Sequence, residues 1–391
     1  MDILYVVDQF PKLSESFVVN EIAELDRRGH EISVFSISKP EEEIIHSELD
    51  ELDIDVCYGK IPSLASIIDL FSPVLLDPNV LKHEIFLENP LHYAYWLHLG
   101  TQIAECIEQV GSVEHIHSHF VPGNRMAAIY AATYHDIPCT ATAHAYEVFA
   151  PESRKRLSRV CRHMDHLVVP SEYNRDYLRQ EVGVQTPISV VPATTNVKKF
   201  EPSEGYTSGR LLTIARLIEK KGYEYAIDAV SDLIERGYEI EYHIIGTGER
   251  REALESRIRE HGIEDHVMFL ENVTDERLKT ELQEAELFVL PCVIAENGDR
   301  DVAPVALKEA MATQTACVST SISAIPELIT DGHDGRLVNP NDTAALAETL
   351  ANLLDNPEER IELAENGRET VQEKFDISSS VDELLKIFER A

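Results

Sequence analysis

The chain has 391 residues, of which 43% are hydrophobic, enough apolar content to bury the cores of two domains. It carries 70 Asp and Glu against 35 Lys and Arg, a formal net charge of −35, which argues against nucleic acids and anionic membrane surfaces as electrostatic partners. The acidic residues are spread along the chain rather than gathered in a tail, and this pattern favours adaptation to high salt.

The cysteines show no Cys-x-x-Cys pair, and most stand among apolar residues where a thiol packs as a small hydrophobe. We therefore expect reduced thiols in a cytoplasmic protein, at Cys57, Cys106, Cys139, Cys161, Cys292 and Cys317. The first residues read as a short strand rather than a secretory leader. No apolar run is long enough to span a bilayer, so any membrane contact is expected to be peripheral.

A β-α-β unit is predicted at the start of the chain. Its elements are a buried strand over residues 3–7, a helix that ends near residue 28 and a second strand over residues 31–37. Ser14 or Ser16 can cap the helix, and Gly29 is placed to end it. Residues 41–110 give a weaker pattern, with helix-prone patches and an aromatic run at 92–96 that core packing explains better than acceptor or membrane contact.

A histidine-rich strand is predicted over residues 113–120, with His115, His117 and His119 alternating onto one face. Three such histidines could bind zinc. Metal sites usually draw ligands from more than one element, so we expect no metal here.

The next predicted strand, residues 138–143, delivers His144 to its carboxyl end. A histidine there, followed by a polar loop, is well placed in a ligand crevice, although a buried structural histidine is the alternative. Further strands at 166–170 and 188–192 complete the first domain, and the polar segment 200–205 is a fair linker. We predict domains over 1–200 and 201–375, followed by a helix over 376–391.

The second domain opens with a strand from residue 210 that delivers Arg216 and Lys221 to a crevice. Arg offers a two-pronged donor to phosphate, and Lys offers a point charge. After the strand 241–245, Gly246 and Gly248 indicate a close backbone approach to a ligand. Strands at 267–270 and 287–290 follow, with a helix capped near Thr274 between them.

A loop carrying Asp301 leads into a helix that starts near Pro304 and carries Glu309. Both carboxylates can reach the crevice beyond a parallel strand, where open α/β sheets bind ligands. The run Asp299-Arg-Asp301 also spells a metal-binding Asp-x-Asp motif, but three residues match by chance and we do not expect a metal.

These motifs resemble those of the family 4 retaining glycosyltransferases. The match comprises Asp301-x-x-Pro304-x-x-x-x-Glu309, the segment Ser323-Ala-Ile-Pro-Glu327-Leu-Ile and the run Asp331-Gly-x-x-Gly335-x-Leu-Val-x-Pro340. The Phe-Pro-x-Leu-Ser-Glu segment and the Asn-Gly-Asp-Arg-Asp run are similar to the exopolysaccharide, colanic-acid-type branch. The resemblance implies the GT-B fold, with two facing Rossmann-like domains and a donor cleft between them.

The resemblance also implies roles for the site residues. Arg216 and Lys221 would neutralise the departing nucleoside diphosphate, so that no metal is needed, and Glu309 would hold the ribose. Asp301, where most members have Glu, would contact the donor sugar, and His144 would lie beside that sugar.

The remaining site residues follow from the same resemblance. Gly246, Gly248 and Pro304 would border the nucleotide, and Ser14, Glu15 and His119 would face the acceptor. The implied reaction moves a sugar from a nucleotide-sugar to a glycan or lipid-linked acceptor at the inner face of the membrane. A GT-B nucleotide-sugar epimerase stays open as an alternative because it has the same fold. A non-catalytic partner subunit stays open because the chain departs from the family pattern at 193–196 and at 323–324.

Overall fold

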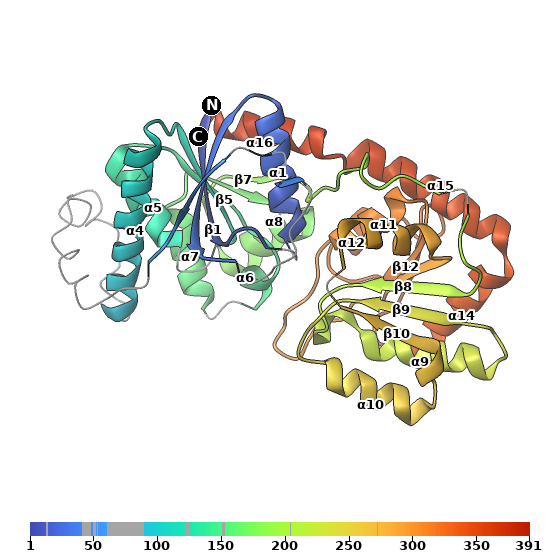
Figure 1. The fold of residues 1–391 in the computed structure, drawn as a ribbon. Coiled ribbons are helices and arrows are strands. Elements are labelled where there is room, and N and C mark those ends of the chain that lie inside the picture. Colours follow the sequence, from blue (N-terminus) through green and yellow to red (C-terminus); the bar gives the residue numbers. More distant parts are fainter. Residues whose placement is uncertain are drawn as a thin grey trace. The chain divides into compact units, whose positions relative to one another are not determined.

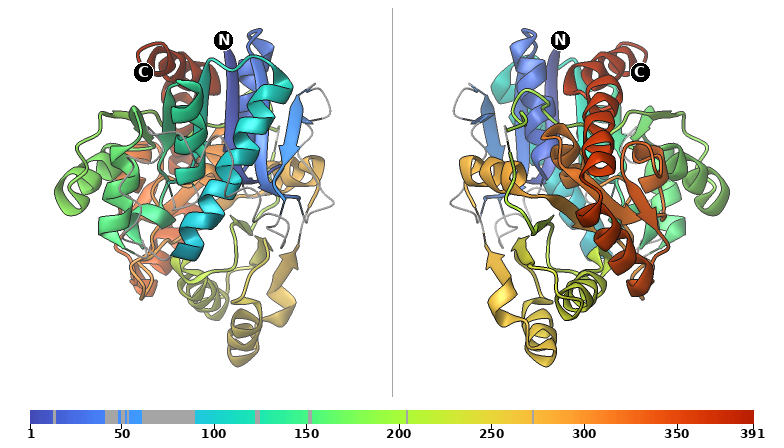
Figure 2. Two further views of the ribbon diagram at one scale, coloured as in Figure 1. Left: turned by 90° about the vertical axis from the view of Figure 1, so that its left-hand side faces the viewer. Right: turned by 90° about the vertical axis from the view of Figure 1, so that its right-hand side faces the viewer.

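The computed structural model describes residues 1–12, 15–40, 48–49, 52, 54–60, 90–121, 125–150, 153–203, 205–271 and 273–391. It divides into two compact units, one of Met1–Pro192 with Val381–Ala391 and one of Ala193–Ser380 (Figure 1). The division falls before the predicted residue 200, since Val197 and Phe200 are buried in the core of the second unit. Both chain ends lie in the first unit (Figure 2).

In the described part of the first unit, seven parallel strands are ordered β3-β2-β1-β4-β5-β6-β7. The strands are β1 Asp2–Gln9, β2 Glu31–Ser38, β3 Asp55–Tyr58, β4 His115–His119, β5 Cys139–Thr142, β6 His166–Val169 and β7 Ile188–Val190. The helices are α1 Ser16–Arg27, α4 Pro90–Val110, α5 Met126–His135, α6 Tyr146–Phe149, α7 Arg154–Arg162, α8 Glu172–Tyr177, η6 Leu178–Val182 and, from Val381 onward, the C-terminal α16 Ile377–Phe388. Chain order reverses between β1 and β4, which is the topological switch point of this sheet.

The second unit repeats this plan with six parallel strands among its described residues, ordered β10-β9-β8-β11-β12-β13. The strands are β8 Arg210–Ile214, β9 Glu241–Ile245, β10 Val267–Leu270, β11 Leu287–Leu290, β12 Ala316–Thr320 and β13 Arg336–Val338. The helices are η7 Glu219–Lys221, α9 Tyr223–Glu235, α10 Arg251–His261, η8 Glu264–His266, α11 Asp275–Glu284, α12 Val305–Ala312, α13 Ile325–Leu328, α14 Thr343–Asp355 and α15 Pro357–Lys374. Its switch point lies between β8 and β11.

The central strands of the second sheet are buried on both faces. Successive residues of a strand point to opposite faces, so Leu211 joins one apolar cluster with α9 and α14, whereas Leu212 joins another with α12. This explains why the strands are nearly continuous apolar runs. Strands at 241–245, 267–270 and 287–290 have the predicted bounds, whereas β3, β12 and β13 were not predicted.

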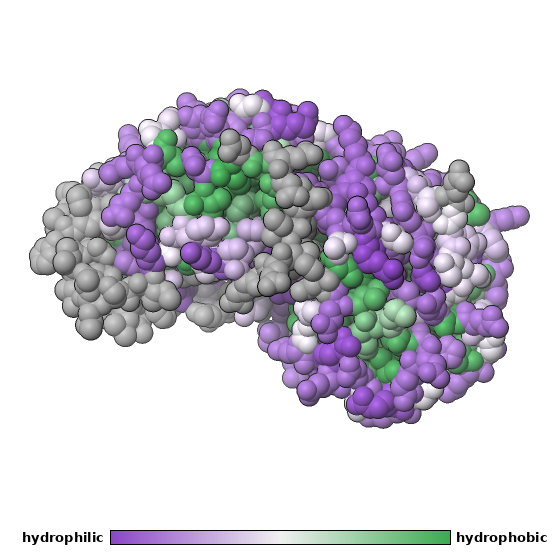
Figure 3. Space-filling view, viewed as in Figure 1, coloured by the Kyte–Doolittle hydropathy of each residue, from purple (hydrophilic) through white to green (hydrophobic). Residues whose placement is uncertain are grey.

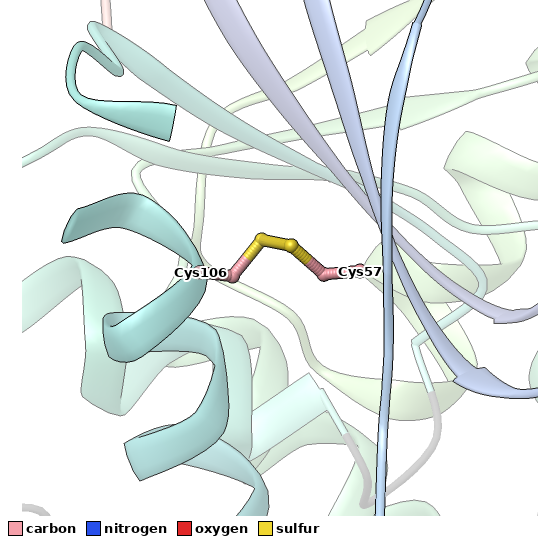
Figure 4. Close-up of a disulfide and its surroundings, with 2 residues drawn as sticks. All are labelled: Cys57 and Cys106. Carbon is pink, nitrogen blue, oxygen red and sulfur yellow. A yellow bond between two sulfur atoms is a disulfide. The ribbon is translucent and has the colours of Figure 1, made fainter. Parts of the chain in front are cut away.

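The expectation of reduced thiols is wrong for two of the six cysteines. Cys57 of β3 and Cys106 of α4 have Cα atoms 6.3 Å apart and form a disulfide (Figure 4). The two lie 49 residues apart, and only the tertiary packing of α4 beside the edge strand β3 brings them together. The other four cysteines are buried and free.

The surface agrees with the acidic composition. Over the face drawn in Figure 3, hydrophilic residues cover most of the described surface and hydrophobic residues appear in separate patches. No helix among the described residues is long and apolar enough to cross a membrane.

Candidate functional site

Charged side chains gather at the switch point of the second unit. Segments that follow β8 carry Arg216, Lys220 and Lys221, and the segment that follows β11 carries Asp299 and Asp301. Because β8 and β11 are parallel neighbours, their carboxyl ends open onto the same edge of the sheet.

Two lysines and two carboxylates form a compact cluster there. Lys220 Nζ lies 3.0 Å from Asp299 Oδ1 and 3.5 Å from Asp301 Oδ1, while Lys221 Nζ pairs with Asp301 Oδ2. Burial opposes the charge on Lys220, but Asp301 and Asp299 raise its pKa overall. Burial likewise opposes the charge on Asp301, and Lys221 and Lys220 together lower the pKa of that carboxyl. The charged forms of Lys220 and Asp301 therefore stabilise each other within this cluster.

Arg216 differs from these lysines. It is exposed, and no carboxylate in the described part of the chain pairs with its guanidinium. A guanidinium keeps its charge and offers donors in a fork that matches phosphate geometry. Arg216 can therefore meet an anionic ligand without first breaking an ion pair.

The backbone conformation and the close packing after β9 explain why two glycines stand there. Gly246 has φ +148° and Gly248 has φ +156°, a backbone region that residues with a Cβ rarely adopt. A Cβ on Gly246 would overlap the carbonyl oxygen of Ala215, and one on Gly248 would overlap that of Leu217. The glycines thus let this turn pack against the loop that carries Arg216.

Helix α12 begins at Val305, just after Pro304, as predicted. Glu309 is buried on this helix, with 7% of its surface exposed. Its neighbour Lys308 is fully buried, and Lys308 Nζ donates to the carbonyl oxygens of Ala193, at 2.5 Å, and Ala303, at 3.1 Å. Burial lowers the pKa of Lys308 to about 7. Lys308 therefore ties the helix that carries Glu309 to the segment where the chain departs from the family pattern.

A different set of groups occupies the switch point of the first unit. His119 ends β4, and His144 follows β5 by two residues. His144 Nε2 lies 3.1 Å from His119 Nδ1, and His119 Nε2 lies 3.1 Å from Glu21 Oε1 of α1. The Tyr5 hydroxyl donates to the same Glu21 oxygen at 2.7 Å. We call Glu21, His119 and His144 the histidine relay.

The His144 backbone is held on both sides. Its N–H donates to Glu147 Oε1 at 2.6 Å, and its carbonyl oxygen accepts from Asn174 Nδ2 at 2.9 Å. The imidazole packs against Phe17 and Phe120, with ring centroids 4.7 and 4.6 Å away. Burial, with His119 and Arg125 nearby, lowers the pKa of His144 well below its ordinary value. His144 is therefore a neutral, rigidly placed imidazole.

The three residues predicted to face the acceptor have different surroundings. Ser14 lies outside the described residues. Glu15 is buried just before α1 and pairs with Lys12 at 2.6 Å. His119 is 1% exposed, with both ring nitrogens in protein contacts. The predicted cap at Ser16 is wrong, because Ser16 is the first helical residue and α1 has no side-chain cap.

The three histidines of β4 lie on one face, as predicted, since Phe388 contacts the rings of His115 and His117 and Tyr5 contacts those of His117 and His119. Among the described residues, Glu21, His117 and His119 bring metal-ligating atoms within 4.8 Å of one another. The nitrogens of His117 already lie 2.8 and 3.0 Å from the hydroxyls of Thr140 and Thr142. These hydrogen bonds give the histidines partners within the protein.

Two residues that the structure places in these sites were not predicted from the sequence. Lys220 was passed over beside Lys221, and no local pattern shows which of two adjacent lysines turns inward. Glu21 sits on α1, among residues that read only as an amphipathic helix. A carboxylate at 15% exposure facing a histidine strand is a signal that only the fold supplies.

Comparisons with known proteins agree with this architecture. The family described as "Glycosyltransferase Family 4" matches residues 14–199, and "Glycosyl transferases group 1" matches residues 196–370. The chain is 26% identical over 429 residues to the amylovoran biosynthesis glycosyltransferase AmsK of Erwinia amylovora, with 100% of both chains covered. It is 38% identical over 167 residues to the putative colanic acid biosynthesis glycosyltransferase WcaL of Escherichia coli, covering 42% of this chain and 41% of that one.

Among solved structures, the fold is similar to that of HepE from Anabaena in complex with UDP and glucose, with a TM-score of 0.75, 13% identity and 100% of both chains covered. A sucrose-phosphate synthase from Thermosynechococcus elongatus gives a TM-score of 0.73 at 18% identity, over 100% of this chain and 99% of that one. The two family matches together run through both Rossmann-like units. The chain therefore belongs to the family 4 glycosyltransferases with the GT-B fold.

Proposed function

We propose that this glycosyltransferase moves a sugar from a nucleotide-diphosphate sugar to a glycan or lipid-linked acceptor, with retention of the anomeric configuration. The observation that carries the proposal is the cation group of Arg216, Lys220 and Lys221 at the switch point of the second unit. In a chain with a net charge of −35, three cations at one sheet edge are suited to an anionic ligand. The names of AmsK and WcaL support a polysaccharide acceptor, and the HepE complex supports a nucleotide-sugar donor.

The chemical role of the cations follows from the leaving group. As the glycosidic bond breaks, negative charge develops on the departing nucleoside diphosphate, and preorganised cations lower that barrier. Arg216 and Lys221 take this role, with Lys221 exchanging its pairing with Asp301 for the diphosphate. Lys220 keeps Asp299 and Asp301 in place during the exchange, because it contacts both carboxylates.

The remaining groups bind the rest of the donor. Glu309 accepts hydrogen bonds from the two ribose hydroxyls, a task for which a carboxylate has two oxygens. Asp301, released from Lys221, accepts from the sugar, and His144 contacts the same sugar. The turn at Gly246 and Gly248 borders the nucleotide.

We also propose that the transfer needs no metal ion. Asp299 and Asp301 supply the Asp-x-Asp pattern, but lysine ammonium groups pair with both of them. A divalent cation would have to displace these ammonium groups. Activity in EDTA equal to activity without it supports the proposal, and loss that manganese restores contradicts it.

The setting we propose is a cytoplasmic enzyme at the inner face of the membrane, in a cell rich in salt. An acidic surface repels itself unless ions screen it, so stability should rise with salt up to molar concentrations. Equal urea midpoints at low and at molar potassium chloride would contradict the salt adaptation and leave the transferase proposal untouched.

A screen of nucleotide-sugars by thermal shift in molar salt tests the proposed activity. A true donor binds only the folded state and raises the melting temperature. Product analysis with the donor that binds then separates the alternatives. Sugar transferred to an acceptor supports the proposal, an isomerised nucleotide-sugar without acceptor identifies an epimerase, and binding without turnover identifies a non-catalytic subunit.

A further inference from the structure

We propose that Glu21 and His119 are positioning residues that fix the tautomer of His144, so that His144 presents an unprotonated Nδ1 to a hydroxyl of the donor sugar. This rests on the proposed function only for the identity of the ligand. The tautomer itself is a property of the first unit, where all three residues lie.

The relay has a defined direction because it ends on a carboxylate. An ionised carboxylate only accepts hydrogen bonds, so His119 must carry its proton on Nε2 to contact Glu21 Oε1. The Tyr5 hydroxyl donates to the same oxygen, and burial, followed by Glu21, raises the pKa of Tyr5 and keeps that donor protonated. Tyr5 therefore holds the Glu21 carboxylate in the position of an acceptor.

The proton on His119 Nε2 sets the state of the next ring. In the proposed arrangement this is the single proton of the His119 ring, so His119 Nδ1 is an acceptor and His144 Nε2 donates to it across 3.1 Å. His144 is neutral as well, and its Nδ1 therefore keeps a lone pair. No described residue hydrogen-bonds to this nitrogen, so the lone pair is left for a hydroxyl donor.

Residues around the histidine relay prevent other hydrogen-bond arrangements of its two rings. His117 lies edge-on to His119, with centroids 5.2 Å apart, but Thr140 and Thr142 occupy its two nitrogens. Arg125 directs Nε and Nη2 to the His119 carbonyl oxygen, at 3.0 and 2.7 Å, and so fixes the end of β4. The backbone hydrogen bonds of His144 hold its loop in place, so the loop cannot shift to accommodate a flipped ring.

The tautomer of His144 matters because the opposite tautomer would present an N–H at Nδ1 in place of a lone pair. A sugar hydroxyl can donate or accept, but only the Nδ1 lone pair lets it donate while its oxygen stays free for other contacts. Loss of the tautomer should therefore lower turnover rather than nucleotide binding, since His144 is assigned to the sugar alone.

The direct test is nitrogen-15 NMR of histidine-labelled, EDTA-treated full-length protein without donor, with His144 assigned from a His144→Gln spectrum. We expect a protonated Nε2 and an unprotonated Nδ1. Glu21→Leu should convert this into a tautomer mixture and lower kcat about tenfold, the effect of losing one net hydrogen bond. The dissociation constant of the nucleoside diphosphate should change less than about twofold, because that ligand lacks the sugar.

Glu21→Gln is the conservative rescue. Tyr5 donates to Oε1, so the glutamine oxygen should keep the acceptor position, preserve the tautomer and lose less than about threefold in kcat. Glu24→Leu is the matched control, because it removes a carboxylate one turn along α1 that pairs with Arg27 and Arg28 at 2.7 Å. It should lower stability without moving the His144 signals or kcat.

Three results would overturn the inference. These are a protonated Nδ1 on His144 in the wild-type protein, a Glu21→Leu variant with wild-type kcat, and equal kcat losses in Glu21→Leu and Glu24→Leu. A wild-type protein that turns over no nucleotide-sugar would instead overturn the proposed function, whereas the tautomer spectrum alone still decides the relay.

Discussion

The two units share one strand order, yet their switch points hold opposite kinds of chemistry. At the second, Lys220 and Lys221 face Asp299 and Asp301 as full charges, and Arg216 stays exposed. At the first, the imidazoles of His119 and His144 stack on each other, and His144 also packs beside Phe17 and Phe120. Exchangeable ion pairs suit a charged diphosphate, whereas directional neutral groups suit sugar hydroxyls. The comparison shows that one strand topology can carry two clusters of different chemistry, and that the side chains at the strand ends decide which chemistry each switch point has.

Stability should differ between the units because only the first contains a disulfide among the described residues. Replacing both Cys57 and Cys106 with Ser should lower the free energy of unfolding by about 4 kcal/mol, since the bridge closes a loop of 49 residues. The chain has one tryptophan, Trp96, buried on the bridged helix α4, so its fluorescence during urea unfolding reports the first unit. A reductant should destabilise the wild-type protein and leave the double variant unchanged. Equal sensitivity of the two proteins to reductant would contradict the bridge.

The two carboxylates of the second unit should separate nucleotide from sugar. Glu309→Gln keeps the shape and removes the charge, and it should weaken both nucleoside diphosphate and donor by about 1.5–3 kcal/mol. Asp301→Asn should spare nucleoside diphosphate binding and lower transfer, because its proposed partner is the sugar. Calorimetric titration of both variants with both ligands measures this. Loss of nucleotide binding in Asp301→Asn but not in Glu309→Gln would mean that the two roles are reversed.

Some strands and some residues of the candidate site could be predicted from the sequence. The strand Leu287–Leu290 was predicted because both of its faces are buried, which leaves an uninterrupted apolar run. Arg216, Lys221, Asp301 and Glu309 were proposed as site residues because they match the motifs of the family.

Features that depend on long-range packing were missed. Edge strand β3 is four residues long and follows an acidic segment, so neither its pattern nor its bridge to Cys106 is visible locally. The burial of Lys220 depends on the turn at Glu219–Lys221, and the part played by Glu21 depends on α1 packing against β4 residues. These are interactions between segments, which a single local pattern does not encode.

Buried titratable groups should give the units opposite pH slopes of stability. Burial raises the pKa of Glu147, in the first unit, to about 7, so the folded state holds a proton that the unfolded state releases above its ordinary value of 4.5. Stability from this group is lost as pH rises from about 4.5 to 7. Lys308, in the second unit, has its pKa lowered to about 7 from 10.5. Between these values the unfolded state binds more protons, so stability rises with pH.

Lys308→Met tests the second slope. The free energy of unfolding of the wild-type protein should rise by about 1 kcal/mol per pH unit between pH 7 and 9, and the variant should lose this rise. Urea titrations at both pH values measure the difference, and Lys199→Met, which removes a lysine paired with Asp275 at 2.8 Å, serves as a control. A variant that keeps the full wild-type slope would show that Lys308 titrates normally in the folded protein.

The central claim is that the switch point of the second unit binds the diphosphate and that of the first unit contacts the sugar. Calorimetric titration of nucleoside diphosphate into wild-type, Lys221→Ala and His144→Ala proteins tests this most directly, with turnover measured on the same samples. Both variants should lose about 10²-fold or more in turnover, the scale for a preorganised group that acts on the transition state. Only Lys221→Ala should also bind the nucleoside diphosphate about tenfold or more weakly, because the proposed partner of the Lys221 ammonium is the diphosphate and that of His144 is the sugar. Wild-type nucleotide affinity in a folded Lys221→Ala protein, together with lost affinity in His144→Ala, would contradict the account.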